Sequence, residues 1–287
     1  MWGITALTSR LPSVLASFKH DIALFQRELI STLVTLEPWS KKPRVLDVDD
    51  AIYVHRNGQT AKRLARCMDH IICGNQFVAD WFSQWNKSIS IVPTAVDTER
   101  FVPAKKTKNN SKQLVIGWIG TSSNHENLFQ IAPALKAVLS IFPQAALRIV
   151  SDKMPPFDQD LNRRLEFVKW SEKSEVEYTQ SMTIGIMPLA DSVWARGKCS
   201  FKMLQYMACG IPVVVSPVGM NEHVLAMGEI GMGATTADEW VDTLSNLLNA
   251  KSLRLKMGRQ GRQVVDAHFS IDVIAPKLAA ILQQIIS

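Results

Sequence analysis

The chain has 287 residues, of which 47% are hydrophobic and 20% charged, and its formal net charge is +6 at pH 7. This composition excludes an intrinsically disordered protein, and the length is sufficient for two α/β domains of ordinary size. Because no apolar run is long enough to span a bilayer and the first residues lack a signal-peptide pattern, we expect a cytoplasmic location.

The excess of positive charge predicts an anionic partner, such as a nucleotide diphosphate, a phospholipid head group or an anionic glycan. Nucleic acid is discounted, because the basic residues are scattered and the lysine-rich stretch 105–112 has the composition of a solvated loop. The four cysteines lack the spacing of a metal site and are interpreted as reduced thiols. A structural role is favoured for Cys199 over that of a nucleophile.

The periodicity of the first hundred residues predicts four strands and two helices. The strands are expected at 22–25, 44–48, 70–73 and 88–92, and the helices at 59–67 and 75–85. Trp81, Phe82 and Trp85 share one face of the second helix, and such a stripe typically packs into a core. An alternative is that this face lies on a membrane, as a lipid-linked acceptor would require.

Beyond residue 113 the alternation of strands and helices is regular, which is typical of a doubly wound parallel sheet. Strands are expected at 114–119, 146–150, 166–169, 183–189 and 211–216. Helices are expected at 124–141, 172–181, 200–209, 237–249, 252–268 and 271–286. The sequence therefore predicts an α/β fold.

The most informative segment, WARGKCSFKMLQYMACGIPVVV at 194–215, joins two of these strands through a helix. Arg196, Gly197, Lys198 and Ser200 lie between the end of the strand and the start of the helix. In a parallel sheet this is where ligands collect, because unpaired N–H groups and the helix dipole favour anions. The alternative is that these cations are ordinary solvated charges.

Within this helix, Phe201, Leu204 and Ala208 have the spacing of a core face. Lys202 and Gln205 lie three residues apart on another face, where they are placed to contact a ligand.

The run QYMACGIPV at 205–213 resembles the donor-site signature of retaining glycosyltransferases of family 4, which have the GT-B fold. That signature reads Glu-Ala-Met-Ala-x-Gly-x-Pro-Val, and the match is strong from Met207 onward. The chain departs from it at the two family carboxylates that contact the donor, where it has Gly197 and Gln205. A subgroup of the family has a lysine three residues before the second carboxylate, as Lys202 is here.

A second stretch, IVPTAVDTERFVP at 91–103, is similar to the interdomain segment of the same family. The resemblance implies two Rossmann-like domains, of which the N-terminal one is incomplete. The expected division is an acceptor-side domain at 1–103, a donor-binding domain at 104–270 and a C-terminal helix at 271–287 that packs back on the first domain.

On the donor side, the resemblance implies that the loop after the strand 114–119 meets the diphosphate through Gly120, Thr121 and Ser122. Many family members have an Arg and a Lys next, where this chain has His125 and Glu126. Charge compensation would then fall mainly to the cations near the later helix. The full set of expected donor-binding residues is Gly120, Thr121, Ser122, Gly197, Lys198, Cys199, Ser200, Gln205 and Gly219.

Three carboxylates lie at the end of the strand 44–48, in the run Asp-Val-Asp-Asp-Ala at 47–51. Because a similar run lies at the cleft of related glycosyltransferases, Asp49, Asp50 and the nearby His55 are expected on the acceptor side. One alternative is that the carboxylates cap the following helix. Another is a Mg²⁺ site with Asp47 as nucleophile, as in haloacid-dehalogenase phosphatases, although Ala51 stands where their motif has Thr.

The resemblance thus implies a retaining glycosyltransferase that moves a sugar from a nucleotide diphosphate to a glycan, lipid or small-molecule acceptor. No metal or other cofactor is expected, and a location at the inner face of the membrane is the alternative to the free cytoplasm. Arg196 and Lys202 would stabilise the charge on the leaving diphosphate, and Gln205 would hold the ribose. The alternatives are a non-catalytic nucleotide-sugar-binding protein or degenerate subunit and, less favoured, the phosphatase.

Overall fold

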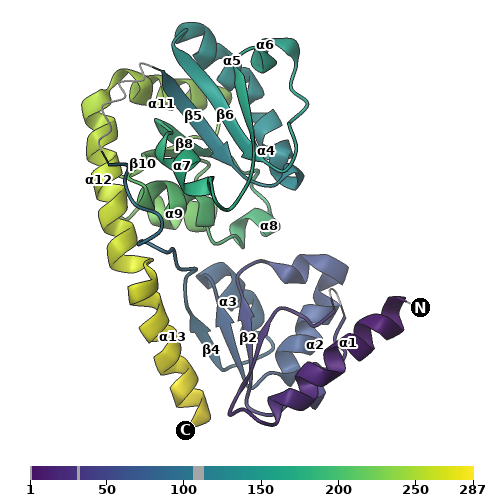
Figure 1. Ribbon diagram of the computed structural model, residues 1–287. Coiled ribbons are helices and arrows are strands. Elements are labelled where there is room, and N and C mark those ends of the chain that lie inside the picture. Colours follow the sequence, from purple (N-terminus) through teal and green to yellow (C-terminus); the bar gives the residue numbers. More distant parts are fainter. Residues whose placement is uncertain (1, 31–32, 106–112) are drawn as a thin grey trace. The chain divides into compact units, whose positions relative to one another are not determined.

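A computed structural model describes residues 2–30, 33–105 and 113–287 (Figure 1). The chain forms two compact units. The first comprises Met1–Thr94, Ser192–Cys199 and Ile274–Ser287, and the second comprises Ala95–Asp191 and Ser200–Val273. Of the loop predicted at 105–112, all but Lys105 lies outside the described residues.

The first unit contains a four-stranded parallel sheet whose strands follow the chain order β1-β2-β3-β4. These strands are β1 (Ala23–Gln26), β2 (Arg44–Val48), β3 (His70–Cys73) and β4 (Ile89–Ile91). The helical segments are α1 (Trp2–Ser17), η1 (Glu37–Trp39), η2 (Ile52–Gly58), α2 (Gln59–Cys67), α3 (Gln76–Phe82) and α8 (Val193–Arg196). Most of α13 (Ile271–Ile286) also belongs to this unit.

The aromatic face of α3 packs into the core of the first unit. Phe82 is fully buried, and the Trp81 ring stacks on that of Tyr53 with 4.3 Å between centroids. Trp85 is half-buried, with the Lys62 ammonium 4.0 Å above its ring. The core interpretation of this stripe is therefore confirmed, and the membrane alternative at this face is wrong.

The second unit contains a six-stranded parallel sheet in the order β10-β9-β8-β5-β6-β7. The strands are β5 (Leu114–Ile119), β6 (Ala145–Ser151), β7 (Leu165–Lys169), β8 (Ile184–Met187), β9 (Val213–Val215) and β10 (Gly231–Gly233). The chain winds outward from β5 in one direction and then from β8 in the other. This is the doubly wound arrangement that the alternation of elements predicted.

Helices cover both faces of this sheet (Figure 1). One face packs on α4 (His125–Gln130), α5 (Ala132–Ile141) and α11 (Ala237–Asn249). The other packs on α7 (Glu175–Gln180), α9 (Phe201–Ala208), α10 (Met220–Leu225) and α12 (Lys251–His268). The short η3 (Ser122–Asn124) and α6 (Gln159–Asn162) complete the unit.

The single helix predicted at 124–141 is wrong, because the structure breaks it into α4 and α5 at Ile131. Pro133 lies in the first turn of α5 and is the cause. It has no N–H to donate, and its ring would collide with the carbonyl four residues earlier in a continuous helix.

No helix among the described residues is long and apolar enough to cross a bilayer.

Candidate functional site

The predicted donor loops of the second unit lie at the carboxyl edge of its sheet. β5 and β8 are neighbours, and the connections from them run to opposite sides, so the sheet has its switch point between these strands. The turn with Gly120 follows β5, the segment leading to α9 follows β8, and Gly219 follows β9. A ligand in the crevice of such a sheet meets these three connections.

The start of α9 is held in an uncommon backbone conformation. Ser200 has φ 56° and ψ 24°, in the left-handed region, and its hydroxyl donates to Asn221 Oδ1 at 2.6 Å. Asn221 is fully buried and donates in turn to the Ser216 carbonyl at 3.0 Å. The connections after β8 and β9 are thereby joined, which fixes the entry to α9. Gly219, at φ 57°, also needs the freedom of glycine.

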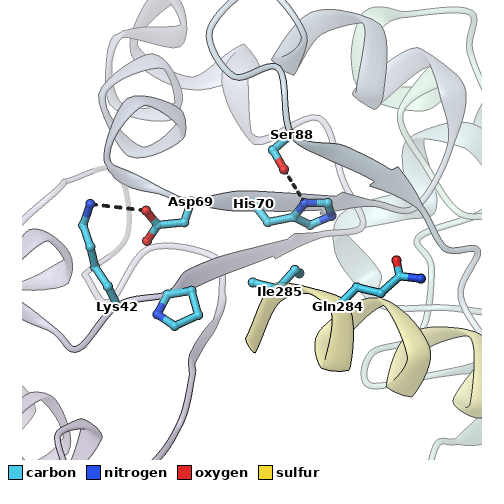
Figure 2. Close-up of a pocket in the computed structure, with 7 residues that line it drawn as sticks. Lys42, Asp69, His70, Ser88, Gln284 and Ile285 are labelled. Carbon is cyan, nitrogen blue, oxygen red and sulfur yellow. Dashed lines mark hydrogen bonds and ion pairs between the residues drawn. The ribbon is translucent and has the colours of Figure 1, made fainter. Parts of the chain in front are cut away.

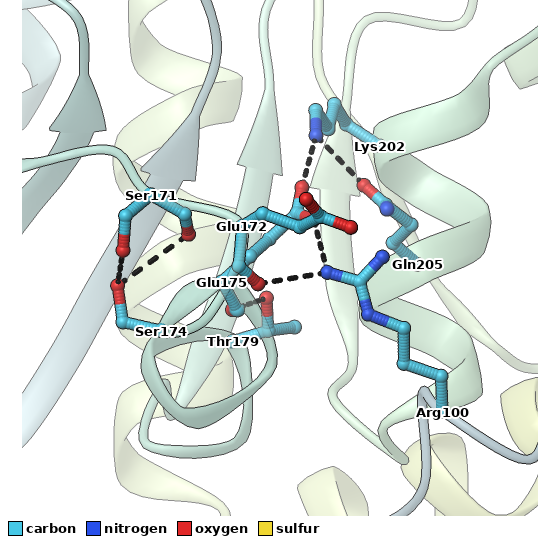
Figure 3. A network of polar contacts seen from close by, with 8 residues as sticks. All are labelled: Arg100, Ser171, Glu172, Ser174, Glu175, Thr179, Lys202 and Gln205. Carbon is cyan, nitrogen blue, oxygen red and sulfur yellow. Dashed lines mark hydrogen bonds and ion pairs between the residues drawn. The ribbon is translucent and has the colours of Figure 1, made fainter.

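The two polar side chains predicted on α9 bind one another and a third residue (Figure 3). The Lys202 ammonium donates to Gln205 Oε1 at 2.8 Å and to Glu175 Oε1 at 2.8 Å. Gln205 is 2% exposed and Glu175 5% exposed. Lys202 is therefore already paired with a buried carboxylate, and the carbonyl oxygen of Gln205 accepts from it.

Arg100 completes this network from the segment after Ala95. Its Nη2 donates to Glu175 Oε2 at 3.4 Å and to the Glu172 carbonyl at 2.8 Å (Figure 3). Two cations, Arg100 and Lys202, thus share the single carboxylate of Glu175. Glu172 adds a second carboxylate to the group, so the charges of its four charged residues balance.

The loop after β5 binds an anion that the chain itself supplies. The Ser122 N–H donates to Asp152 Oδ1 at 2.6 Å, and its hydroxyl donates to Asp152 Oδ2 at 2.8 Å. These hydrogen bonds lower the pKa of Asp152 to about 2. Thr121 and Asn124 bond to each other at 2.9 Å. Whether Gly120, Thr121 and Ser122 contact a donor stays a prediction.

The predicted acceptor-side carboxylates lie together in the first unit. Asp50 forms an ion pair with Arg27, whose Nε is also 4.0 Å from Asp49 Oδ1. Burial and then the charge of Asp49 raise the pKa of Asp50, against the lowering effect of Arg27 and Lys198. Lys198 thus lies near this carboxylate, with its ammonium 5.6 Å from the Trp194 ring.

The helix-capping interpretation of these carboxylates is wrong. The residue that precedes η2 is Ala51, and no side chain caps that helix. Asp50 is held by Arg27 instead. His55, within η2, is exposed, and its ring centroid lies 5.6 Å from that of Trp194.

Gly197 lies against Ala51 in the first unit. A Cβ on Gly197 would stand 2.5 Å from the Ala51 Cβ and 2.9 Å from the Ala51 nitrogen. Asn75, buried at the start of α3, donates to the Gly197 carbonyl at 3.0 Å. The position where the family has its first carboxylate therefore has no space for a side chain.

The structure divides the predicted site residues between the two units. Arg196, Gly197, Lys198 and Cys199 belong to the first unit, with Asp49, Asp50 and His55. Gly120, Thr121, Ser122, Ser200, Lys202, Gln205 and Gly219 belong to the second. The joint action of Arg196, Lys198 and Lys202 on one diphosphate stays a prediction.

Sequence reasoning missed Glu175, Arg100, Asn221 and Asp152. Glu175 had a signal, because it lies four residues before Thr179 and therefore on the same face of its helix, and Thr179 is buried. A carboxylate on that face needs a cationic partner. Arg100 bonds to Glu175, Asp152 to Ser122 and Asn221 to Ser200, and each of these partners is more than twenty residues away, so no local pattern reveals them.

A separate hollow of about 490 Å³ lies in the first unit (Figure 2). There His70 Nδ1 is 2.7 Å from the Ser88 hydroxyl, and Lys42 pairs with Asp69 at 3.3 Å. His70 begins β3, so this hollow is at the amino end of a strand. The predicted acceptor-side residues follow the carboxyl end of β2 and are not part of it.

In the part of the chain that the structure describes, no three His, Cys, Asp or Glu side chains are grouped so that they could hold a metal ion.

Residues 113–250 match the family model described as "Glycosyl transferases group 1". This segment is a group 1 glycosyltransferase domain. It contains the whole switch-point edge described above, from the turn with Gly120 to the connection with Gly219.

The chain is also similar to a curated relative from Corynebacterium glutamicum. This is a GDP-mannose-dependent monoacylated alpha-(1-6)-phosphatidylinositol monomannoside mannosyltransferase, 26% identical over 214 residues. The match covers 67% of this chain and 55% of the relative. The chain therefore spans about half the length of that protein.

Solved structures show that the group 1 domain is part of a GT-B fold. Anabaena Alr3699/HepE in complex with UDP-glucose matches 96% of this chain and 81% of its own, with a TM-score of 0.75 and 15% identity. A glycosyltransferase from Rickettsia africae matches 99% of this chain and 82% of its own, with a TM-score of 0.73 and 12% identity. Sucrose-phosphate synthase from Thermosynechococcus elongatus matches 96% of this chain and 76% of its own, with a TM-score of 0.71 and 15% identity. The predicted α/β fold with two Rossmann-like domains is confirmed.

Proposed function

We propose that this chain transfers a sugar from a nucleotide diphosphate donor to an acceptor, with retention of anomeric configuration. The observation that carries the proposal is the position of Lys202 and Gln205 at the switch-point edge of a group 1 glycosyltransferase domain, where Glu175 holds the lysine in place. The donor is a substrate, and the proposal needs neither a metal ion nor another cofactor.

In this proposal the donor lies against the loops after β5, β8 and β9. Lys202, with Arg196 or Lys198, stabilises the negative charge that grows on the leaving diphosphate. Gln205 bonds a ribose hydroxyl through its amide N–H, because its carbonyl oxygen already accepts from Lys202. Asp49, Asp50 and His55 then orient the acceptor.

The names of the relatives guide the choice of substrates. The Corynebacterium relative is a GDP-mannose-dependent enzyme acting on a phosphatidylinositol mannoside, and Alr3699/HepE is in complex with UDP-glucose. We propose a lipid-linked or glycan acceptor, reached in the cytoplasm or at the inner face of a membrane. GDP-mannose and UDP-glucose are the first donors to test.

The test is titration calorimetry of the purified chain with UDP-glucose, GDP-mannose and ADP-glucose, together with an NMR measurement of slow donor hydrolysis. We expect one donor to bind and to be hydrolysed with retention. The triple variant R196A/K198A/K202A should weaken binding at least about 100-fold, since each charge-assisted hydrogen bond contributes about 1.5–3 kcal/mol. The control, K169A/K173A/K251A, makes the same change in net charge at exposed lysines and should bind as the parent does.

A non-catalytic nucleotide-sugar-binding protein is the second candidate, favoured by the absence of space at Gly197 for the family carboxylate. It would bind the donor without hydrolysis or transfer. A phosphatase would instead release phosphate only with Mg²⁺ and would lose this activity in D47N. If no donor binds to the parent, or if the triple variant binds the donor as the parent does, the glycosyltransferase proposal is wrong.

A further inference from the structure

The segment 192–199 belongs to the first unit, although the chain immediately before and after it belongs to the second. The Trp194 ring packs on the core of the first unit, and its centroid lies 5.6 Å from that of His55. The segment also contains Arg196 and Lys198, two of the three cations that are predicted to act on the donor. Whatever fixes this segment within the first unit therefore also fixes where these two cations begin.

The side chain of Asn75 holds the backbone of this segment. Asn75 is the residue before α3 and is 6% exposed. Its Oδ1 accepts from the Val78 N–H at 3.0 Å, which caps α3. Its Nδ2 donates to the Gly197 carbonyl at 3.0 Å and to the Lys198 carbonyl at 3.4 Å. Because an N–H only donates and a carbonyl only accepts, these partners determine the orientation of the carboxamide.

The approach of the segment to Asn75 depends on Gly197. A Cβ at this position would overlap Ala51, so the lack of a side chain lets the Gly197 carbonyl come within reach of the amide. The N–H groups of Arg196, Gly197 and Lys198 donate to carbonyls earlier in the same segment, at 2.9, 3.3 and 3.1 Å. The turn that carries the two cations is thus closed on itself, and the Asn75 amide ties it to the first unit.

We propose that Asn75 is a positioning residue for Arg196 and Lys198. Its amide fixes the backbone at residues 197–198, from which these side chains reach the donor. The consequence for the donor rests on the proposed glycosyltransferase function. An ammonium or guanidinium group stabilises a phosphate only at a suitable distance and angle, because both the Coulomb energy and the hydrogen bond weaken as the groups separate. An amide of the acceptor-side unit then controls donor binding without touching the donor.

Serine at position 75 separates this role from the capping of α3. Serine is as favourable an N-cap as asparagine, but it has a single polar atom, which the Val78 N–H engages. Asn75→Ser (N75S) therefore keeps the cap and removes the bonds to the Gly197 and Lys198 carbonyls. A residue with only a capping role would tolerate this change.

Asn86 offers a matched control, because its side chain makes the same set of bonds elsewhere in the first unit. Its Oδ1 accepts from the Ser88 N–H at 2.8 Å. Its Nδ2 donates to the Ala65 carbonyl at 3.0 Å and to the Met68 carbonyl at 2.8 Å. N86S thus makes the same chemical change to a residue that does not hold the segment 192–199.

The first measurement is hydrogen exchange of the full chain without donor, followed for each amide by NMR. In N75S we expect the amides at 196–198 to exchange about five-fold faster, which is the effect of one ordinary hydrogen bond. The Val78 amide should keep its protection, and N86S should leave the amides at 196–198 as they are in the parent. Unchanged exchange at 196–198 in N75S would overturn the inference, and so would an equal increase at Val78.

The second measurement is titration calorimetry with UDP-glucose and GDP-mannose. N75S should weaken binding of the donor about three- to ten-fold, whereas N86S should bind it as the parent does. In the R196A/K198A background, adding N75S should change nothing, because Asn75 acts through these two cations. A full effect of N75S in that background would overturn the inference. A parent that binds neither donor, with the expected exchange pattern in N75S, would confirm the hold on the segment and overturn the proposed function alone.

Discussion

Lys202 and Glu175 form an ion pair of 2.8 Å in which the carboxylate is buried and the ammonium is partly exposed. Because Lys202 also donates to Gln205, Glu175 orients both polar side chains of α9 through one cation. Arg100 binds the same carboxylate from the other side. Glu175 therefore fixes the positions of Lys202 and Gln205 on α9.

The substitution Glu175→Gln should destabilise the chain. It keeps the shape of the side chain but leaves Lys202 and Arg100 without a compensating charge. We expect a loss of about 1–3 kcal/mol in stability, less than for a fully buried pair because both cations are partly exposed. The control is Glu172→Gln, an exposed glutamate three residues earlier, which should change stability by less than about 0.5 kcal/mol. Thermal unfolding compares the two, and equal midpoints would contradict a stabilising role for the Glu175 carboxylate.

Gly197 should not tolerate a side chain. The added Cβ of Gly197→Ala would overlap Ala51, and overpacking of this kind costs about 1–3 kcal/mol. Gly228→Ala is the matched control, because its nearest neighbour would lie at 3.8 Å. We expect a lower melting temperature for the Gly197 variant and little change for the control. A Gly197 variant as stable as the parent would show that residue 197 has room for the family carboxylate.

Most of the fold could be predicted from periodicity and breaker residues. The bounds of β2, β3, β5, α2, α11 and α13 agree with the predicted ranges residue for residue. These elements either alternate with clear polar boundaries or show a long amphipathic pattern. The prediction failed where the pattern is short or interrupted. β10 is the tripeptide Gly-Met-Gly, and α1 contains Pro12, which reads as a break.

The candidate site was less predictable, because its contacts join residues that are distant in sequence. The motif at 194–215 identified Lys202 and Gln205, but Glu175 lies 27 residues before Lys202 and Arg100 lies in the segment after the first unit. A local pattern predicts where a side chain points and not what it meets. Ser122 illustrates this, since the N–H that was expected to meet a diphosphate donates to Asp152 in the structure.

Asp47 should reduce stability at neutral pH. Burial, and then the charge of Asp49, raise its pKa above the ordinary value of 3.8. The folded chain therefore holds this proton to higher pH than the unfolded chain. The resulting stability is fully present below the unfolded pKa and is lost as pH rises through the folded pKa. Asp47→Asn removes this loss, so we expect the variant to be more stable than the parent at about pH 7.

The difference should shrink as pH falls to about 4, because both chains then have a neutral group at position 47. Urea unfolding at several pH values measures it, with the exposed Asp21→Asn as the control that should stay near the parent throughout. An Asp47→Asn variant less stable than the parent at neutral pH would contradict this. It would mean that a positive charge stabilises the ionised Asp47 carboxylate more than burial destabilises it.

Asp152 should titrate far below an ordinary carboxyl. The Ser122 N–H and hydroxyl lower its pKa to about 2, so its stabilising bonds are present above 3.8 and are lost as pH falls through about 2. A carboxyl carbon NMR titration of the parent should show this midpoint. In Ser122→Ala one of the two bonds is gone, and the midpoint should move up towards 3.8. An unchanged midpoint would mean that the hydroxyl does not bind the carboxylate in solution.

The same carboxylate bears on donor binding. If the diphosphate approaches the loop after β5, the charge of Asp152 opposes it, and Asp152→Asn should strengthen donor binding a few-fold at low salt. The exposed Asp238→Asn makes the same charge change away from this loop and should have no such effect. Weaker donor binding in Asp152→Asn would mean instead that Asp152 orders the loop for the donor. In that case the hydrogen bonds by which Asp152 fixes Ser122 contribute more to donor binding than the repulsion between its charge and the diphosphate takes away.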